Sequence, residues 1–299
     1  MGTTTKHNDA GDGDEFKEVI TMMCNCNFPG CTAPGTIKTA LARRGGRNAY
    51  MCEYHAFNIA SYSTDNNRRQ GKTKVSKDTF GWEFETSFSD LTARGELIAA
   101  KFLPTADCTV DVEYKSPIYN GLNSISKTFT TFDKLIAGGH LRIGEGCGTH
   151  THYGNRDYID RETMDYIRRF YHSLFVPLCE AIRENSDKTA AFWGRDFEYY
   201  ASPINRNSYA TEHTNFINVQ HNNTIEFRLV KYQNAEQMMR VARFIKAVGN
   251  CLVENFIKHF NDADFDTRRY SNATAYRKHK AEVTAQKIVK LYIKAISEI

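Results

Sequence analysis

The sequence has no run of about 18 apolar residues, and its first fifteen residues hold no apolar stretch of the kind found in secretory signals. These two absences predict a cytoplasmic protein without a membrane span. Disulfide bonds are rare in that compartment, so the eight cysteines favour metal ligands or free thiols. The chain also lacks internal repeats and low-complexity tracts, so no repeat architecture is predicted.

The chain has no large excess of charge of either sign. Lys and Arg number 39 against 35 Asp and Glu, a formal net charge of +4, which is weak support for an acidic partner. Hydrophobic residues make up 41% and charged residues 25%, as in an ordinary folded soluble protein. At 299 residues, the chain is long enough for one large domain with a small appendage.

Changes in composition divide the chain into four parts. Residues 1–15 are polar with almost nothing apolar, which predicts a disordered tail. Residues 16–60 hold the cysteine-rich segment. Residues 61–78 are polar and basic without periodicity, which is typical of a solvated linker, with a nucleic-acid patch as the alternative. Residues 79–299 carry long periodic apolar patterns and form the predicted main domain.

The cysteine-rich segment contains two short-spaced pairs of metal-ligand residues. Cys26 and Cys31 form one pair, and Cys52 and His55 form the second, 20 residues further on. Tight turns let such pairs share a tetrahedral zinc ion, so we expect a structural Zn²⁺ site. The spacing resembles the small treble-clef-like zinc modules of phage and bacterial proteins, and in a phage protein the compartment would be the host cytoplasm. Cys24 can replace Cys26, and unligated buried thiols are the alternative interpretation.

Four stretches of the main domain alternate large apolar residues with ionisable ones. The ionisable members are Glu83 and Glu85, then Asp111, Glu113 and Lys115, then His150 and His152, and finally Glu226 and Arg228. Residues two apart in a strand point to the same face. We therefore predict one sheet whose apolar face packs on helices and whose ionisable face lines a cavity. Solvated strand faces and surface ion pairs are the alternative for each motif taken alone.

Longer apolar periods predict helices around these strands. The expected helices cover residues 91–102, 124–138, 160–182 with a kink at Pro177, 234–256 and 274–297. Asp160 is the predicted N-cap of the third, and Asn234 with Gln237 is a capping-box pair for the fourth. Residues 186–223 are mixed and rich in aromatic residues and Asn, and we expect short strands and loops there, including a strand at Asn215–Val219.

The strand motifs follow one another in a definite order. They are F-G-x-E-x-E, D-x3-D-V-E-x-x-S-P, C-G-x-H-x-H and T-I-E-F-R. In this order, over roughly residues 79–260, the sequence resembles the amidoligase family, relatives of glutamine synthetase and the glutamate–cysteine ligases. The resemblance implies an α+β fold in which an antiparallel sheet backed by long helices forms an active-site funnel. It also implies ATP and Mg²⁺, and a carboxylate that is phosphorylated and then attacked by an amine to form an amide bond.

The resemblance also implies roles for individual residues. Glu83, Glu85 and Glu113 would bind magnesium, and His150 and His152 would contact metal, nucleotide or substrate. Glu226 and Arg228 would complete the catalytic set, with Arg228 on a phosphate. Arg206, together with Arg195 and His221, lies in the segment before the last strand and is a further candidate for phosphate contacts.

The residue types suit this chemistry independently of the resemblance. Phosphoryl transfer needs positioning and charge neutralisation, Mg²⁺ prefers oxygen ligands, and an arginine can hold a phosphate by two hydrogen bonds. A histidine can carry a proton near neutral pH. Cys147 is an alternative nucleophile, but glycines flank it on both sides, as expected for a small residue in a tight turn.

Two other functions stay open at this level. A His-x-His pair with a carboxylate can bind a catalytic zinc, which would make the protein a metallohydrolase. The zinc module and basic linker can instead bind nucleic acid beside a non-enzymatic main domain. Thr151 and the Asp107-Cys108-Thr109 stretch depart from the family pattern. The carboxylate and amine substrates can be small molecules, peptides or modified macromolecules.

Overall fold

The computed structural model describes residues 77–105, 110–123, 125–197, 201–204, 209–210, 212, 214–259, 269 and 271–299, together with the strands 37–39 and 49–51. The chain divides into two units, Met1–Ala56 and Phe57–Ile299. In the first unit, β1 (Ile37–Thr39) and β2 (Ala49–Met51) form an antiparallel pair.

The predicted tail, residues 61–76 of the predicted linker and the zinc ligands lie outside the described residues, and the last linker residue, Asp78, already belongs to β3 (Asp78–Thr86). These ligands are Cys26, Cys31, Cys52 and His55, with Cys24 as the spare. The zinc module therefore stays a prediction.

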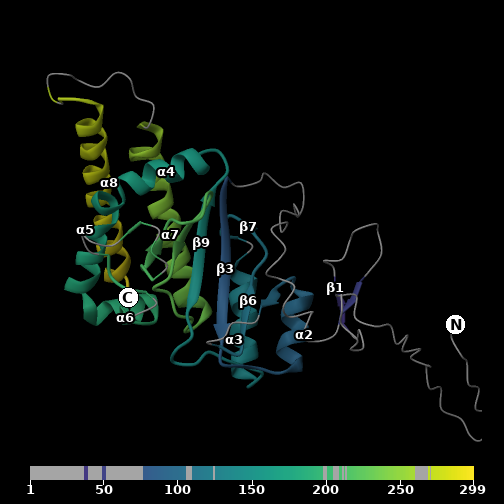
Figure 1. The fold of residues 1–299 in the computed structure, drawn as a ribbon. Helices are drawn as coiled ribbons and strands as arrows, with labels where there is room; N and C mark the ends of the chain where they lie inside the picture. Colours follow the sequence, from purple (N-terminus) through teal and green to yellow (C-terminus); the bar gives the residue numbers. More distant parts are fainter. Residues whose placement is uncertain are drawn as a thin grey trace, which may run out of the picture. The chain divides into compact units, whose positions relative to one another are not determined.

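A seven-stranded antiparallel sheet is the centre of the second unit (Figure 1). Its strands are β3 (Asp78–Thr86), β5 (Leu103–Thr105), β6 (Val112–Lys115), β7 (Tyr119–Asn120), β9 (Thr149–Asn155), β10 (Ile217–Asn218) and β11 (Ile225–Phe227). Their order is β10-β11-β9-β3-β6-β5, and β7 pairs with one end of β3. Two further strands, β4 (Phe88–Ser89) and β8 (Leu141–Arg142), pair separately. The predicted α+β class with an antiparallel sheet is confirmed.

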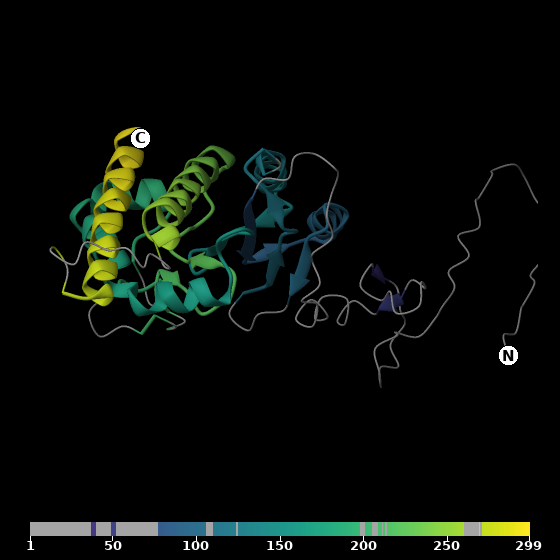
Figure 2. The same ribbon diagram turned by 90° about the horizontal axis from the view of Figure 1, so that it is seen from above.

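Helices complete the second unit. They are α2 (Leu91–Ala99), α3 (Ser126–Ala137), α4 (Arg161–Arg169), α5 (Tyr171–Glu184), α6 (Ser186–Trp193), α7 (Ala235–Asn255), the short 3-10 helix η2 (Ile257–His259) and α8 (Ala273–Ser297). Helices α7 and α8 lie side by side, and α5 packs on α8 (Figure 2). None of the described helices is both long enough and apolar enough to cross a bilayer.

Capping residues define several helix starts, as the sequence predicts. Asp160 accepts a hydrogen bond from the Thr163 amide and Asn234 accepts one from the Gln237 amide, each at 2.9 Å. The Gln237 side chain does not return the bond, because no hydrogen bond reaches its Oε1 atom; its Nε2 donates to the carbonyl of Phe192. Only the first of the two capping-box hydrogen bonds is therefore formed at α7. The Gln237 side chain instead connects α7 to α6.

Two predictions in the helical part are wrong. The helix expected over 160–182 is two helices that meet at Phe170, and Pro177 lies inside the second, α5. The Phe170 ring packs edge-on against Tyr166 and Phe256, so tertiary contacts interrupt the helix where no helix-breaking residue stands. The unassigned stretch after residue 186 begins with α6, which ends at Gly194 in a left-handed conformation (φ 89°).

The apolar face of β3 forms the core against the helices. Trp82 stacks on Phe80 with ring centroids 5.6 Å apart and meets Phe129 of α3 edge-on at 5.4 Å. Phe84 stacks on Phe132 of the same helix at 4.1 Å. All five rings are at most 1% exposed, so this face of the strand is fully covered.

Helix α7 approaches the sheet closely at Gly249. A Cβ atom at this position would lie 2.1 Å from the Tyr153 ring of β9. Only glycine lets the helix and the strand come this near, so Gly249 fixes how α7 lies against β9.

Candidate functional site

The ionisable residues of four strands project from the other face of the sheet. Antiparallel pairing sets Glu83 of β3 opposite His150 of β9 on one side and Lys115 of β6 on the other. Directly opposed residues share a face and stand about 5 Å apart. The register therefore assembles the four predicted motifs side by side.

We call this group the ionisable cluster. Its members are Glu83, Glu85, Glu113, Lys115, His150, His152, His221, Glu226 and Arg228. The register also sets Glu85 opposite Glu113, and His152 opposite both Gly81 and Glu226. Of these members, Lys115 belongs to the alternation of β6 but had no role assigned to it, and His221 lies between β10 and β11.

Glu83 and His150 form the middle of the ionisable cluster. His150 Nδ1 lies 3.4 Å from Glu83 Oε2 and 3.5 Å from Glu226 Oε1, while its Nε2 lies 3.5 Å from Glu85 Oε1. The His150 side chain is 6% exposed. A single buried imidazole therefore faces three carboxylates from two different strands.

Glu226 and Arg228 are a buried ion pair on β11 and its extension. Arg228 Nη1 donates to Glu226 Oε1 at 2.6 Å, and the two side chains are 5% and 3% exposed. His221 Nε2 lies 3.6 Å from the other carboxylate oxygen of Glu226. Arg195 donates to the main-chain carbonyl of Arg228 at 2.5 Å. Arg228 thus holds Glu226 in place, and its predicted phosphate contact stays a prediction.

Glu85, Glu113 and Lys115 form the other end of the cluster. Glu85 Oε2 accepts a 2.5 Å hydrogen bond from the Gly148 amide, in the turn before β9. Lys115 Nζ lies 3.0 Å from Glu113 Oε1 and 3.1 Å from Glu83 Oε1. Thr105 also donates to Glu113 Oε1 at 3.2 Å. Thr105 of β5 and Lys115 of β6 therefore supply hydrogen-bond donors to the carboxylates at this end of the cluster.

Burial and neighbouring charges shift the pKa values of the cluster in opposite directions. Burial alone would raise the pKa of Glu83, but His150, His152 and Lys115 hold it well below its usual range. Burial likewise opposes ionisation of Glu226, yet the three histidines and Arg228 lower its pKa to about 2. The site therefore keeps these two carboxylates ionised in spite of their burial.

Burial and neighbouring charges also shift the pKa values of other members of the cluster. Burial would lower the pKa of His152, but Glu83 and Glu226 raise it above its usual value. Burial and the charge of Glu83 raise the pKa of Glu113. Burial would lower the pKa of Lys115, but the two carboxylates beside it raise it. Strong shifts of this kind are typical of functional sites.

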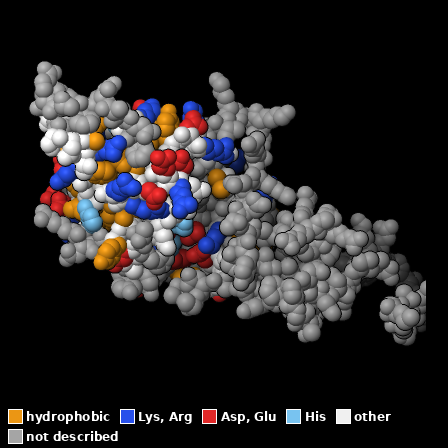
Figure 3. Space-filling model, turned by 45° about the horizontal axis from the view of Figure 1, so that its top comes forward, with side chains coloured by type: hydrophobic (Ala, Val, Ile, Leu, Met, Phe, Trp, Pro, Cys, Tyr) orange, Lys and Arg blue, Asp and Glu red, His pale blue; other side chains and the backbone are white. Residues whose placement is uncertain are grey.

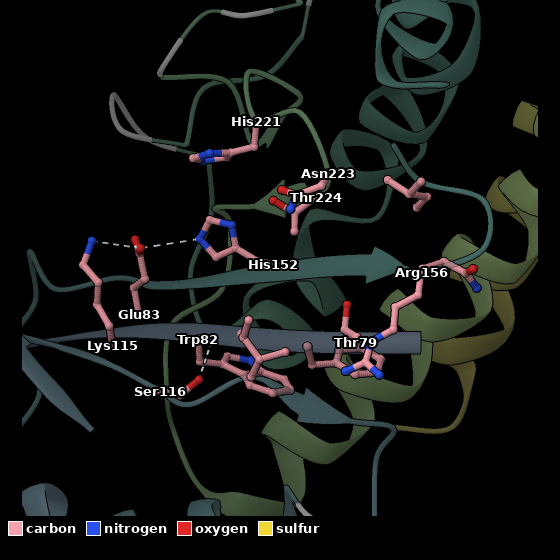
Figure 4. A pocket seen from close by; sticks show the side chains of 15 residues that line it. Thr79, Trp82, Glu83, Lys115, Ser116, His152, Arg156, His221, Asn223 and Thr224 are labelled. Atoms are coloured by element: carbon pink, nitrogen blue, oxygen red, sulfur yellow. Dashed lines mark hydrogen bonds and ion pairs between the residues drawn. The ribbon is translucent and has the colours of Figure 1, made fainter. Parts of the chain in front are cut away.

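A cavity of about 600 Å³ adjoins the ionisable cluster. Glu83, Lys115, His152 and His221 line one end, and Arg156, Asn223 and Thr224 line another part (Figure 4). Gly81 also lines the cavity, and a Cβ atom there would meet the Cβ of His152 at an ordinary 3.8 Å. The space is large enough for a small-molecule substrate.

The structure brings together most of the residues that the sequence singles out. The strand residues to which the resemblance gives a role all lie in the ionisable cluster, but Asp111, expected on the same face, instead accepts hydrogen bonds from Ser89 and pairs with Arg94. Cys147 is buried nearby with a pKa that burial raises. Arg206 lies outside the described residues. Lys115 was visible in the alternation of its strand, but nothing in the sequence showed that it would point between two carboxylates.

One group of side chains has the geometry of a metal site. Ligand atoms of Glu83, His150 and Glu226 all lie within 4.8 Å of one another. His152 is outside this group among the described residues, and no hydrogen bond reaches its buried Nε2 atom. Carboxylate oxygens and an imidazole nitrogen are ligands for divalent ions such as Mg²⁺, Mn²⁺ and Zn²⁺.

Comparisons with known proteins add no assignment to this geometry. No family model matches the sequence, and no curated protein matches it either.

Proposed function

We propose that this protein is an ATP- and Mg²⁺-dependent carboxylate–amine ligase, with a glutamine-synthetase-like funnel over the ionisable face of the sheet. The observation that carries the proposal is the convergence of Glu83, His150 and Glu226, from three neighbouring strands, beside a cavity of about 600 Å³. The order of the four sequence motifs, which resembles the amidoligases, supports the same reading.

The donor set fits a divalent cation. Two carboxylates whose pKa values are held low are ready to bind a cation at neutral pH. The buried Nε2 atom of His152 lies 3.6 Å from Glu83 Oε1, so His152 contacts a carboxylate of the proposed cation site and also lines the cavity. When bound, the cation would neutralise phosphate charge.

The chain's own residues would hold and orient the reactants. Glu83, His150 and Glu226 would hold the cation, and Arg228 would fix the orientation of Glu226 through its 2.6 Å hydrogen bond. His152 stands at the edge of the cavity and can exchange a proton with an attacking amine near neutral pH. Glu85 and Glu113 would add negative charge next to the cation.

The two alternatives have less support. A catalytic zinc of the His-x-His type would need both histidines on one ion, whereas the converging group contains His150 and not His152. Nucleic-acid binding would favour a field of one sign. On the face shown in Figure 3, Lys and Arg side chains are interspersed with Asp and Glu. The described part therefore favours the ligase over the metallohydrolase, while the nucleic-acid alternative rests on the zinc module and linker, outside the described residues.

Calorimetry of MgATP binding tests the proposal. We expect wild-type protein to bind ATP only when Mg²⁺ is present, and Glu83→Gln to lose this binding. Glu96→Gln, on the exposed side of α2, removes the same charge away from the cluster and should bind as wild type does. Phosphate release in the presence of paired acids and amines then identifies the substrates.

Three results would contradict the proposal. Absence of ATP binding by folded wild type removes the cosubstrate, and equal binding by Glu83→Gln removes the assigned site. Tight Zn²⁺ binding with hydrolysis that needs no ATP would favour the metallohydrolase instead.

A further inference from the structure

Lys115 occupies a particular place in the ionisable cluster. Its ammonium group lies 3.1 Å from Glu83 Oε1 and 3.0 Å from Glu113 Oε1, so it joins the carboxylates of two adjacent strands. Figure 4 shows Lys115 and His152 approaching the Glu83 carboxylate from opposite sides. The lysine therefore stands on the side of Glu83 away from His152.

Without this lysine, the same place would hold a concentration of negative charge. Glu85 and Glu113 face each other across β3 and β6, and Glu83 is next to both. Carboxylates packed this closely need a cation between them. In a site that binds phosphates, that cation can be a second metal ion or a fixed ammonium group.

We infer that the centre takes one divalent cation, held by Glu83, His150 and Glu226, and that the Lys115 ammonium is the second cation of the site. This inference rests on the proposed function, because it assumes that the first ion binds. Lys115 would then supply a fixed positive charge to an anionic group in the cavity, which it lines together with Glu83.

The charges of the cluster agree with a single ion. Its four carboxylates face two permanent cations, Lys115 and Arg228, which leaves two negative charges once the bound ion has displaced any proton from the neighbouring histidines. One divalent ion balances them. Removing Lys115 adds one more uncompensated negative charge beside Glu85 and Glu113, and this opens a site for a second ion.

Titration with Mn²⁺, followed by electron paramagnetic resonance, counts the bound ions directly. Mn²⁺ is a suitable probe because it shares the ligand preferences of Mg²⁺. We expect about one Mn²⁺ per chain for wild type and about two for Lys115→Ala, with the spin coupling of two ions a few ångströms apart. Lys115→Arg keeps the charge and should bind one.

A matched control removes a lysine that contacts no carboxylate of the cluster. Lys231 donates to the main-chain carbonyl of Glu145 at 2.8 Å, so Lys231→Ala should still bind one ion. Adding Glu113→Gln to Lys115→Ala should return the count to one, since it removes a ligand of the second ion.

The number of bound ions tests the role of Lys115 separately from the proposed metal centre. Two ions in the wild type would overturn the role of Lys115, whether or not the variants fold, and would leave the ligase proposal in place. One ion in folded Lys115→Ala would also overturn it. Absence of any bound Mn²⁺ in folded wild type would overturn both this inference and the metal centre on which it rests.

Discussion

The two faces of the central sheet are built on the same strands and have opposite energetics. On one face, Phe80, Trp82 and Phe84 pack against helices with almost no exposed area, which stabilises the fold through apolar burial. On the other face, Glu83 and Glu226 are ionised in a largely buried setting, which costs desolvation energy. The difference teaches that the apolar face carries the stability, while the ionisable face costs energy that the proposed cation would offset.

The largest test of this contrast removes a ring from the apolar face. Trp82→Ala should lower the free energy of unfolding by about 3–5 kcal/mol, because it deletes a fully buried indole that stacks between strand and helix. Urea unfolding in the presence of a chelator measures the loss. A change below about 1 kcal/mol would show that the core does not depend on this face.

A second test breaks a pair on the ionisable face. Arg228→Met leaves Glu226 buried beside no guanidinium, so we expect a loss of about 3 kcal/mol in the free energy of unfolding. Adding Glu226→Met should restore much of it, since apolar replacement of a whole buried pair is often neutral. Arg240→Met, which removes the exposed pair with Glu236, is the control and should cost less than about 0.5 kcal/mol. A double variant no more stable than Arg228→Met would contradict the argument.

A third test asks whether the ionisable face gains stability from its ligand. Mn²⁺ at about 100 times its dissociation constant should stabilise the wild type by about 2.7 kcal/mol. His150→Ala should lose this gain, because it removes the imidazole at the centre of the converging group. Thermal unfolding with and without Mn²⁺ gives the comparison. Equal stabilisation of the wild type and His150→Ala would place the ion elsewhere in the chain.

The smallest expected effect concerns Asp90, an ionised side chain at the protein surface. Asp90 caps α2 through the Ala93 amide and lies 2.8 Å from His140 Nδ1; together these contacts lower its pKa. The contribution of a carboxyl with a lowered pKa is present above its unfolded pKa of about 3.9 and is lost as the pH falls through the folded value.

Asp90→Asn keeps the capping oxygen and removes the charge. Its urea midpoint should lie slightly below that of the wild type at neutral pH, and the two should converge in acid. A difference that persists in acid would mean that the charge is not its cause.

The sequence predicted the strands of the site well because the alternation of residue types is a local signal. Glu83, His150 and Glu226 lie on strands far apart in the chain, yet each carries its own period-two pattern. The sequence predicted that these strands share one sheet, but it did not give the order in which they pair. The distances within the cluster depend on register, which no local pattern contains.

The failures also have physical causes. The interruption at Phe170 goes with a ring contact to Phe256, a residue far along the chain that the sequence around residue 170 does not reveal. Helix α6 has a weakly patterned sequence and ends at Gly194, where a Cβ atom would lie 2.1 Å from the Lys231 carbonyl oxygen. The role of Lys115 depends on two carboxylates of which one is 32 residues away.

Gly81 gives the cavity a bare main-chain floor two residues from Glu83. Unlike Gly249, where any side chain would collide with a ring, residue 81 has room for a methyl group at ordinary contact distance. The depth of the cavity at Gly81 is therefore separable from the packing that holds the fold together. Gly81→Ala would make the cavity slightly shallower while every member of the ionisable cluster stays in place.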